Sequence, residues 1–272
     1  MLHDAPHMTV TDPLLLQRFL SRTGINPSQD RSLLIESIAA AFSRIPYENL
    51  TKIIKAESVI TPRSAMRYPD ELISDYLKWG TGGTCFSLTA AIVAVYNALG
   101  IEAHPVLADR HYGPDTHCGL VIAQGGQFLL LDPGYLLFVP TMLHKDRESV
   151  IQTGSNTIEL KPVLNGEKVE LYTVYRKNRK LRLTYKITPI DAAQFARAWE
   201  SSFAWEMMNY PVLTRRSNGS QHYLQGDKLA IYSENDAKRF LLGDDAKVNL
   251  IASSFGIDRE IINKALGVIK HG

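Results

Sequence analysis

The segment Thr81-Gly82-Gly83-Thr84-Cys85-Phe86-Ser87-Leu88 joins a pair of glycines to the start of an apolar helix. The helical pattern runs from Cys85 to Leu99 and ends at Gly100, and glycine commonly terminates helices. Because the run is mostly apolar, we expect this helix to be buried. A thiol in the first turn of a helix lies at the positive end of the helix dipole, which favours the thiolate. The segment therefore predicts a central helix and an activated sulfur nucleophile.

Helical patterns also precede this segment. Pro13 opens a helix directly after Asp12, and Asp30 is expected to cap a second helix that ends before Pro46. Pro69-Asp70-Glu71 opens a third helix, with acidic residues in the first turn, where the dipole favours them. Residues 1–100 are therefore predicted to form a helical domain that carries Cys85.

Beyond Gly100, the pattern becomes typical of β-strands. Five short runs are rich in β-branched, aromatic and aliphatic residues: 101–107, 117–122, 128–131, 169–175 and 181–187. Gln124-Gly125-Gly126 predicts a hairpin turn between the second and third runs. We therefore expect an antiparallel sheet or small barrel over residues 101–189.

The last part of the chain, residues 190–272, mixes the two patterns. Helical periodicity returns at 191–203, 246–254 and 258–266, and residues 221–232 indicate a short hairpin between them. The order of helices, then strands, then a mixed region predicts an α+β fold.

A candidate base and a candidate carboxylate follow Cys85 along the chain. His117 begins one predicted strand and Asp132 ends the next, and a turn centred on Gly125 would place them nearly opposite each other. Nucleophilic thiol chemistry needs an imidazole near the sulfur and a carboxylate on the far ring nitrogen. Taken singly, each residue type is more often structural. Together, in this order and with paired strands, they favour a Cys-His-Asp site.

These motifs resemble the signatures of the arylamine N-acetyltransferase family. The family's Arg-Gly-Gly-x-Cys-Phe-Glu segment, its Thr-His strand and its Asp-Val-Gly-Phe turn are similar to the Cys85 segment, Thr116-His117 and Asp132-Pro133-Gly134-Tyr135. Upstream, Ile45-Pro46-Tyr47-Glu48-Asn49-Leu50 resembles the family's Ile-Pro-Phe-Glu-Asn-Leu element. The resemblance extends from about Leu14 to the hairpin near Tyr232.

The resemblance implies a helical bundle, a central antiparallel β-barrel and a C-terminal α/β lid around a cysteine-protease-like Cys-His-Asp core. It implies that Cys85 accepts an acyl group, His117 acts as the base and Asp132 orients the imidazole. The acyl group would come from acetyl-CoA or another acyl thioester, used as a co-substrate, and would pass to an aromatic amine or hydrazine. We expect the pocket for these small molecules to be lined by Phe86, Tyr135 and Tyr47.

Several positions depart from the family pattern. Thr81 replaces the family arginine, so Glu48 loses its usual partner, which is costly for a buried carboxylate unless another donor replaces it. Ser87 replaces an acidic residue, and Leu136-Leu137-Phe138-Val139-Pro140 replaces a glycine-rich continuation. Because these changes affect expected acyl-donor contacts, the residues that bind the co-substrate stay unknown. An amide synthase or thiol hydrolase acting on a carrier-bound acyl chain, and a non-catalytic binding protein, stay open.

Composition adds bounds on the class of protein. The 272 residues are 45% hydrophobic and 21% charged, which is ordinary for a globular protein. The formal charge of +2 gives no reason to expect nucleic acid or membrane as a partner. Two cysteines fit a reducing compartment, and Met1–Met8 shows no signal pattern, so a cytoplasmic location is expected. The sequence does not decide the amine acceptor, the acyl chain length, or between a monomer and a homodimer.

Three weaker features complete the candidates. The spacings of His104, His111, His117 and Cys118 match no common metal motif, so no metal site and no permanently bound cofactor are expected. The basic run 176–182 could contact phosphates, although a solvated hairpin tip is the favoured interpretation. Cys118 is adjacent to His117, and strand alternation predicts that its side chain faces the opposite side of the strand.

Overall fold

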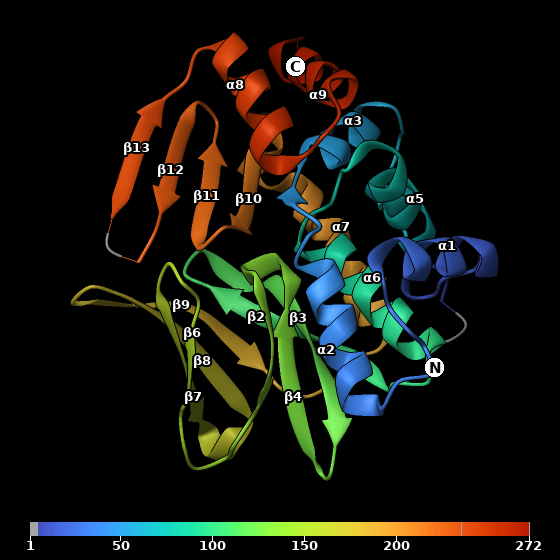
Figure 1. Ribbon diagram of the computed structural model, residues 1–272, viewed down its shortest axis with the longest axis vertical. Coiled ribbons are helices and arrows are strands. Elements are labelled where there is room, and N and C mark those ends of the chain that lie inside the picture. Colours follow the sequence, from blue (N-terminus) through green and yellow to red (C-terminus); the bar gives the residue numbers. More distant parts are fainter. Residues whose placement is uncertain (1–4, 235, 272) are drawn as a thin grey trace.

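The computed structural model describes residues 5–234 and 236–271, so the first four residues of the N-terminal segment lie outside the described part. Helices lie beside a strongly curved sheet, and a second, smaller sheet with its own helices covers one end of both (Figure 1). The predicted α+β class is confirmed, with a helical bundle, a barrel-like antiparallel sheet and an α/β lid. Within the described residues, no helix combines the length and apolar character that crossing a bilayer requires.

The helical bundle surrounds one buried helix, α6. Its helices are α1 (Pro13–Thr23), α2 (Arg31–Phe42), α3 (Leu50–Glu57), α4 (Pro62–Ala65), α5 (Pro69–Trp79) and α6 (Cys85–Ala98). The predicted starts at Pro13 and Pro69 are confirmed, and the Asp12 carboxylate caps α1 by accepting from the Leu14 and Leu15 N–H groups.

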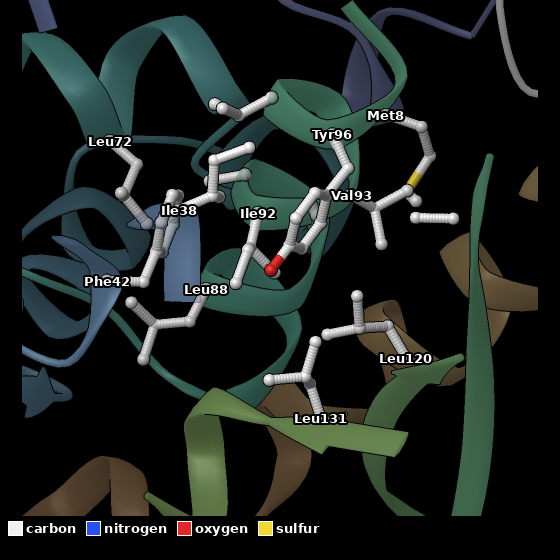
Figure 2. Packing of buried hydrophobic residues seen from close by; sticks show 14 of the residues in the cluster. Met8, Ile38, Phe42, Leu72, Leu88, Ile92, Val93, Tyr96, Leu120 and Leu131 are labelled. Atoms are coloured by element: carbon white, nitrogen blue, oxygen red, sulfur yellow. The ribbon is translucent and has the colours of Figure 1, made fainter. Parts of the chain in front are cut away.

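Helix α6 is buried because apolar side chains approach it from both the bundle and the sheet. Figure 2 shows Leu88, Ile92 and Tyr96 of α6 between Phe42 of α2 and Leu131 of the sheet. The Tyr96 hydroxyl donates to the Ile35 carbonyl at 2.9 Å, which satisfies the one polar group of this buried ring. This packing fixes the position of the helix start that carries Cys85.

The central sheet has eight antiparallel strands in the order β5-β4-β3-β2-β9-β8-β7-β6. The strands are β2 (Ala103–Arg110), β3 (Gly113–Gln124), β4 (Gln127–Asp132), β5 (Leu137–Met142), β6 (Ser149–Gln152), β7 (Thr157–Val163), β8 (Lys168–Tyr175) and β9 (Asn178–Lys186). The two end strands, β5 and β6, contact each other, so the sheet is a nearly closed barrel. Leu120 and Ile122 of β3 pack toward α6, whereas Val121 packs into the barrel with Leu130 and Tyr185.

The observed register of the β3–β4 hairpin differs from the predicted register by two residues. Gln124 pairs with Gln127, so the turn is Gly125-Gly126, and both glycines have positive φ angles of 58° and 76°. Continuing this register places Gly119, not His117, opposite Asp132. An interval of two residues keeps a side chain on the same face of the strand, so His117 still shares a face with Asp132.

The lid combines a five-stranded sheet with C-terminal helices. Its strand order is β1-β10-β11-β12-β13, with bounds Tyr47–Glu48, Val212–Ser217, Ser220–Gln225, Lys228–Tyr232 and Ala237–Leu241. The helices are α7 (Ala192–Ser201), α8 (Asp244–Leu250), the π-helix η7 (Ile251–Phe255) and α9 (Arg259–His271). Short 3₁₀ turns in the bundle, the barrel and the lid are η2 (Pro6–Met8), η3 (Pro133–Tyr135), η4 (Leu164–Gly166), η5 (Ser202–Ala204) and η6 (Glu206–Asn209). Strand β1 pairs with β10 and bridges from Tyr47 to Gly83, so it connects the lid to the segment before α6.

Candidate active site

The structure brings the predicted histidine and aspartate together. His117 Nε2 lies 2.6 Å from Asp132 Oδ2, and both side chains are fully buried. An ionised carboxylate only accepts hydrogen bonds, so Nε2 carries the proton and donates it to Asp132. Asp132 also accepts from the Tyr185 hydroxyl at 2.6 Å and from the Tyr135 N–H at 2.8 Å. These donors orient the carboxylate, which in turn orients the imidazole.

Cys85 completes the group at the first residue of α6, where its side chain is 3% exposed. His117 and Cys118 both lie close enough to its sulfur to act on its ionisation. Gly134 of η3 lies directly against this contact. A Cβ added to Gly134 would lie 2.5 Å from Cys85 Cβ and 3.0 Å from His117 Cε1. Glycine is therefore required at this position for the thiol and the imidazole to meet.

The surroundings of Cys85 favour its thiolate. Hydrogen bonding from Cys118, together with the positive charges of His117 and Arg110, lowers the pKa of Cys85 well below its usual value despite burial. Burial and the hydrogen bond to Cys85 raise the pKa of Cys118. Burial alone would lower the pKa of His117, but the charge of Asp132 raises it overall, with Arg110 opposing that rise. Cys85 is therefore the thiol that ionises first.

Cys118 lies closer to the nucleophile than strand alternation alone suggests. Its side chain packs on the face of β3 that covers α6, opposite the barrel interior, as predicted. Its sulfur lies 3.5 Å from the Thr89 hydroxyl, one helical turn after Cys85. Because α6 begins over this face, the Cys118 thiol lies close to the Cys85 sulfur.

Arg110 is a site residue that the sequence analysis missed. Its Nη2 group lies 3.0 Å from His117 Nδ1, the ring nitrogen that does not contact Asp132. Arg110 is the last residue of β2, and the pairing of Ala108 with His117 places it on the same face as the imidazole. The alternating pattern of residues 101–107 ended too early to include it.

The three predicted pocket residues have different surroundings. The Tyr135 ring lies edge-on to His117, with ring centroids 6.4 Å apart. The Tyr47 side chain is buried, and its backbone bridges to Gly83 in the nucleophile segment. Phe86 is fully buried in an aromatic cluster, at centroid distances of 5.5, 6.4 and 6.2 Å from Phe195, Trp199 and Trp205. Phe86 thus connects the nucleophile helix to the segment that leads into the lid.

Possible binding groups for other ligands are sparse in the described part of the chain. Across residues 5–234 and 236–271, no three His, Cys, Asp or Glu side chains are grouped so that they could hold a metal ion. Residues 176 and 177 of the basic run form the turn of the β8–β9 hairpin, and the rest of the run lies in β9. A groove of about 250 Å³ lies beside the residues that follow η3, and Leu136, Val139 and Arg216 are among those that line it.

Comparison with solved structures identifies the fold. The structure matches an arylamine N-acetyltransferase from Mycobacterium abscessus with a TM-score of 0.79 and 16% identity, over 94% of both chains. The Mycobacterium marinum enzyme in complex with CoA matches with a TM-score of 0.77 and 17% identity, over 94% of this chain and 98% of the other. A Bacillus cereus enzyme, described as having a Cys-His-Glu catalytic triad, matches with a TM-score of 0.70 and 17% identity, over 92% and 100%. The chain has the arylamine N-acetyltransferase fold. No protein-family model and no curated protein sequence matches it.

The structure supplies the other donor that Glu48 needs in the absence of the family arginine. Arg67 Nη1 lies 3.6 Å from Glu48 Oε1, and both side chains are buried. Arg67 also donates to the Gly82 carbonyl at 2.5 Å, so the same guanidinium holds the glycine pair before Cys85. A cation from another part of the chain has taken over this position.

Proposed function

We propose that this protein is an acyltransferase of the arylamine N-acetyltransferase type. It would move an acetyl or other acyl group from a CoA-type thioester to Cys85 and then to an aromatic amine or hydrazine. The observation that carries this proposal is the Cys85-His117-Asp132 arrangement, located at the helix start and hairpin end of this fold. The family-level similarity of the fold supports acyl transfer, and the bound CoA in the M. marinum enzyme supports a thioester donor.

In the first half-reaction, the Cys85 thiolate attacks the thioester carbonyl carbon. The carbon–sulfur bond to the carrier breaks, and the carrier thiol leaves after taking the proton held by His117. Asp132 stabilises the imidazolium that exists before this proton transfer. The product is an acyl-Cys85 thioester.

In the second half-reaction, the amine attacks the acyl-enzyme and His117 accepts the amine proton through Nδ1. The Cys85–acyl bond breaks, which releases the amide and regenerates the thiolate–imidazolium pair. Backbone N–H groups in the first turn of α6 are the proposed oxyanion donors in both steps. Thr84, at the N-cap of α6, makes no side-chain capping bond to these groups, so they are available to an oxyanion.

Tyr135 and Tyr47 are the aromatic residues proposed to contact the acyl or amine group. Phe86 is proposed to line the same pocket from its buried aromatic cluster. Tyr135 lies beside the base, which is where an attacking amine must approach. A ring at this place would favour a flat aromatic acceptor over a flexible aliphatic one.

Intact-protein mass spectrometry tests the first half-reaction directly. After incubation with acetyl-CoA, we expect one acetyl group on the wild type and on Cys118→Ser, and none on Cys85→Ser. Addition of an aromatic amine or hydrazine should remove the label from the first two proteins. Label from an acyl-carrier thioester but never from acetyl-CoA would overturn the CoA donor and favour the amide synthase alternative. Release of the label by water as fast as by amines would favour the hydrolase.

The alternative of a non-catalytic binding protein is tested by the reactivity of Cys85. The expected loss of the Glu48 partner was one reason for it, and Arg67 removes that reason. We expect alkylation by iodoacetamide to saturate well below about pH 8, where a free thiol titrates. Alkylation that needs a higher pH and does not respond to His117→Ala would favour the binding protein.

A further inference from the structure

Arg110 lies on the catalytic face of the barrel without belonging to the triad. In regular antiparallel pairing, Ala108 stands opposite His117, and alternation returns Arg110 to the same face two residues later. The regular register ends there, because Arg110 pairs with Gly113. A single β2 residue, Asp109, is thus opposite three β3 residues, 114–116. Such bulges re-aim side chains at the ends of strands.

This bulge is held by its own polar contacts. The Asp115 N–H donates to Asp109 Oδ1 at 2.9 Å, and Asp115 has a positive φ of 56°. Lys186 Nζ lies 2.9 Å from Asp109 and 2.6 Å from Asp115, which joins both sides of the bulge to β9. The Arg110 N–H donates to the Thr116 hydroxyl at 3.3 Å. The backbone of Arg110 is therefore fixed relative to His117.

The guanidinium of Arg110 has an unusual set of partners. Its Nη2–H donates to His117 Nδ1 at 3.0 Å, whereas its buried Nε has no hydrogen-bond partner in the described structure. Across residues 5–234 and 236–271, no carboxylate lies within ion-pair distance of it. Tyr112 beside it, Cys85 of α6, Tyr47 of β1 and Asp132 of β4 act on it electrostatically. It also interacts with the hydroxyls of Tyr135, Tyr185 and Tyr223. Burying an arginine without a carboxylate partner costs free energy.

We propose that Arg110 is a positioning residue that holds His117 as the neutral Nε2–H tautomer and lowers its affinity for a proton. This inference rests on the proposed acyl transfer. A guanidinium has no lone pair to offer, so Nδ1 can only accept from it, and the protonated ring loses this bond. The positive charge of Arg110 also disfavours a second positive charge on the ring.

This role differs between the two half-reactions. When Cys85 is ionised and His117 is protonated, Nδ1–H donates to the thiolate. The guanidinium of Arg110, which no longer donates to Nδ1, is then a second cation near the sulfur. In the acyl-enzyme the sulfur is uncharged, and His117 must be neutral to accept the proton of the amine. Arg110 keeps the ring neutral at that stage and disfavours its retention of the proton afterwards. We therefore expect Arg110 to set the pH below which the rate of the second half-reaction falls, that is, the acid limb of its pH–rate profile.

The direct test is an NMR titration of His117 in the Cys85→Ala background, where no thiolate contributes. Arg110→Met should raise the pKa of His117 by about one unit or more, because it removes both a like charge and a donor to the neutral ring. Arg110→Gln keeps a donor without charge, and Arg110→Lys keeps the charge without the fork, so each should cause a smaller rise. Arg179→Met, at the exposed β8–β9 hairpin, is the matched control and should leave the titration unchanged.

Kinetics of the second half-reaction give the second readout. With pre-acetylated Cys85, the acid limb of amine transfer should move to higher pH in Arg110→Met and in the same order for the other variants. An unchanged His117 titration in a folded Arg110→Met protein would overturn the proposal. If the Met variant does not fold, the titrations of the Gln and Lys variants decide in the same way. Because the titration needs no acyl donor, failure of the proposed acyl transfer would be seen separately, as absence of acetylation in the wild type.

Discussion

Arg67 and Glu48 form a buried ion pair, with Arg67 Nη1 3.6 Å from Glu48 Oε1, although no arginine occupies the position before the glycine pair. Arg67 precedes α5, and Glu48 lies in the short strand β1, which joins the lid sheet. The same guanidinium donates to Asp75 at 2.7 Å and to the Gly82 carbonyl. This residue therefore links the lid strand, the bundle and the Cys85 segment.

Removing this cation should destabilise the protein strongly. Arg67→Met leaves the Glu48 carboxylate buried and without its ion-pair partner, which typically costs about 3–5 kcal/mol in the free energy of unfolding. Urea denaturation measures the loss. Arg63→Met removes an exposed pair at 3.8 Å with Glu200 and should cost less than about 1 kcal/mol. Adding Glu48→Gln to Arg67→Met should recover part of the stability; no recovery would contradict the ion-pair explanation.

Gly134→Ala should slow acylation strongly while the rest of the fold persists. The new Cβ would meet Cys85 Cα at 2.9 Å and His117 Cε1 at 3.0 Å, so the thiol and the imidazole must move apart. A displacement of about 1 Å at a reacting group can cost roughly 100-fold in rate. Intact-mass acetylation kinetics provide the measurement, and Gly267→Ala, where an added Cβ meets nothing within 4 Å, is the control. Wild-type rates in Gly134→Ala would show that Cys85 and His117 need not touch.

Cys118→Ala should make Cys85 a weaker acid. Cys118 lowers the pKa of the Cys85 thiol, so its removal should move the pH midpoint of iodoacetamide alkylation upward. Cys118→Ser supplies a hydroxyl donor at the same place and should stay close to the wild type. Equal midpoints in Cys118→Ala and the wild type would mean that His117 and Arg110 suffice to stabilise the thiolate.

Lys52 should make the stability of the protein depend on pH above neutrality. Its ammonium donates to the Ser202 carbonyl and hydroxyl at 2.8 and 2.7 Å, and burial lowers its pKa from 10.5 to about 7. Between these pH values the unfolded chain is protonated and the folded one is not, so the free energy of unfolding rises with pH by about 1.4 kcal/mol per unit. If Lys52→Met has a higher free energy of unfolding than the wild type, this difference should therefore shrink as the pH rises from 7 to 10. Denaturant titrations at several pH values test this, and a constant difference would contradict it.

Most of the helices, though not α3 and α4, and the three residues of the candidate triad could be predicted because their signals are local. Prolines at helix starts, an acidic N-cap at Asp12 and the glycine after α6 act on the backbone within one turn. Cys85, His117 and Asp132 are recognisable because each stands at the end of an element with a clear pattern. Strands β5, β6, β7, β10 and β13 had weaker patterns, because short or half-exposed strands depend on their neighbours for stability.

Residue types and element order thus followed from local backbone preferences and from the spacing of apolar side chains, which act within a few residues. Three relationships at the site depended on packing between distant segments. A bulge in the β2–β3 pair positions Arg110 beside His117. The packing of α6 on β3 brings Cys118 close to the start of α6. The segment before α5 brings Arg67 to Glu48. Register, bulges and helix seating are decided by long-range contacts, so the electrostatic setting of the thiol emerged only when the chain was folded.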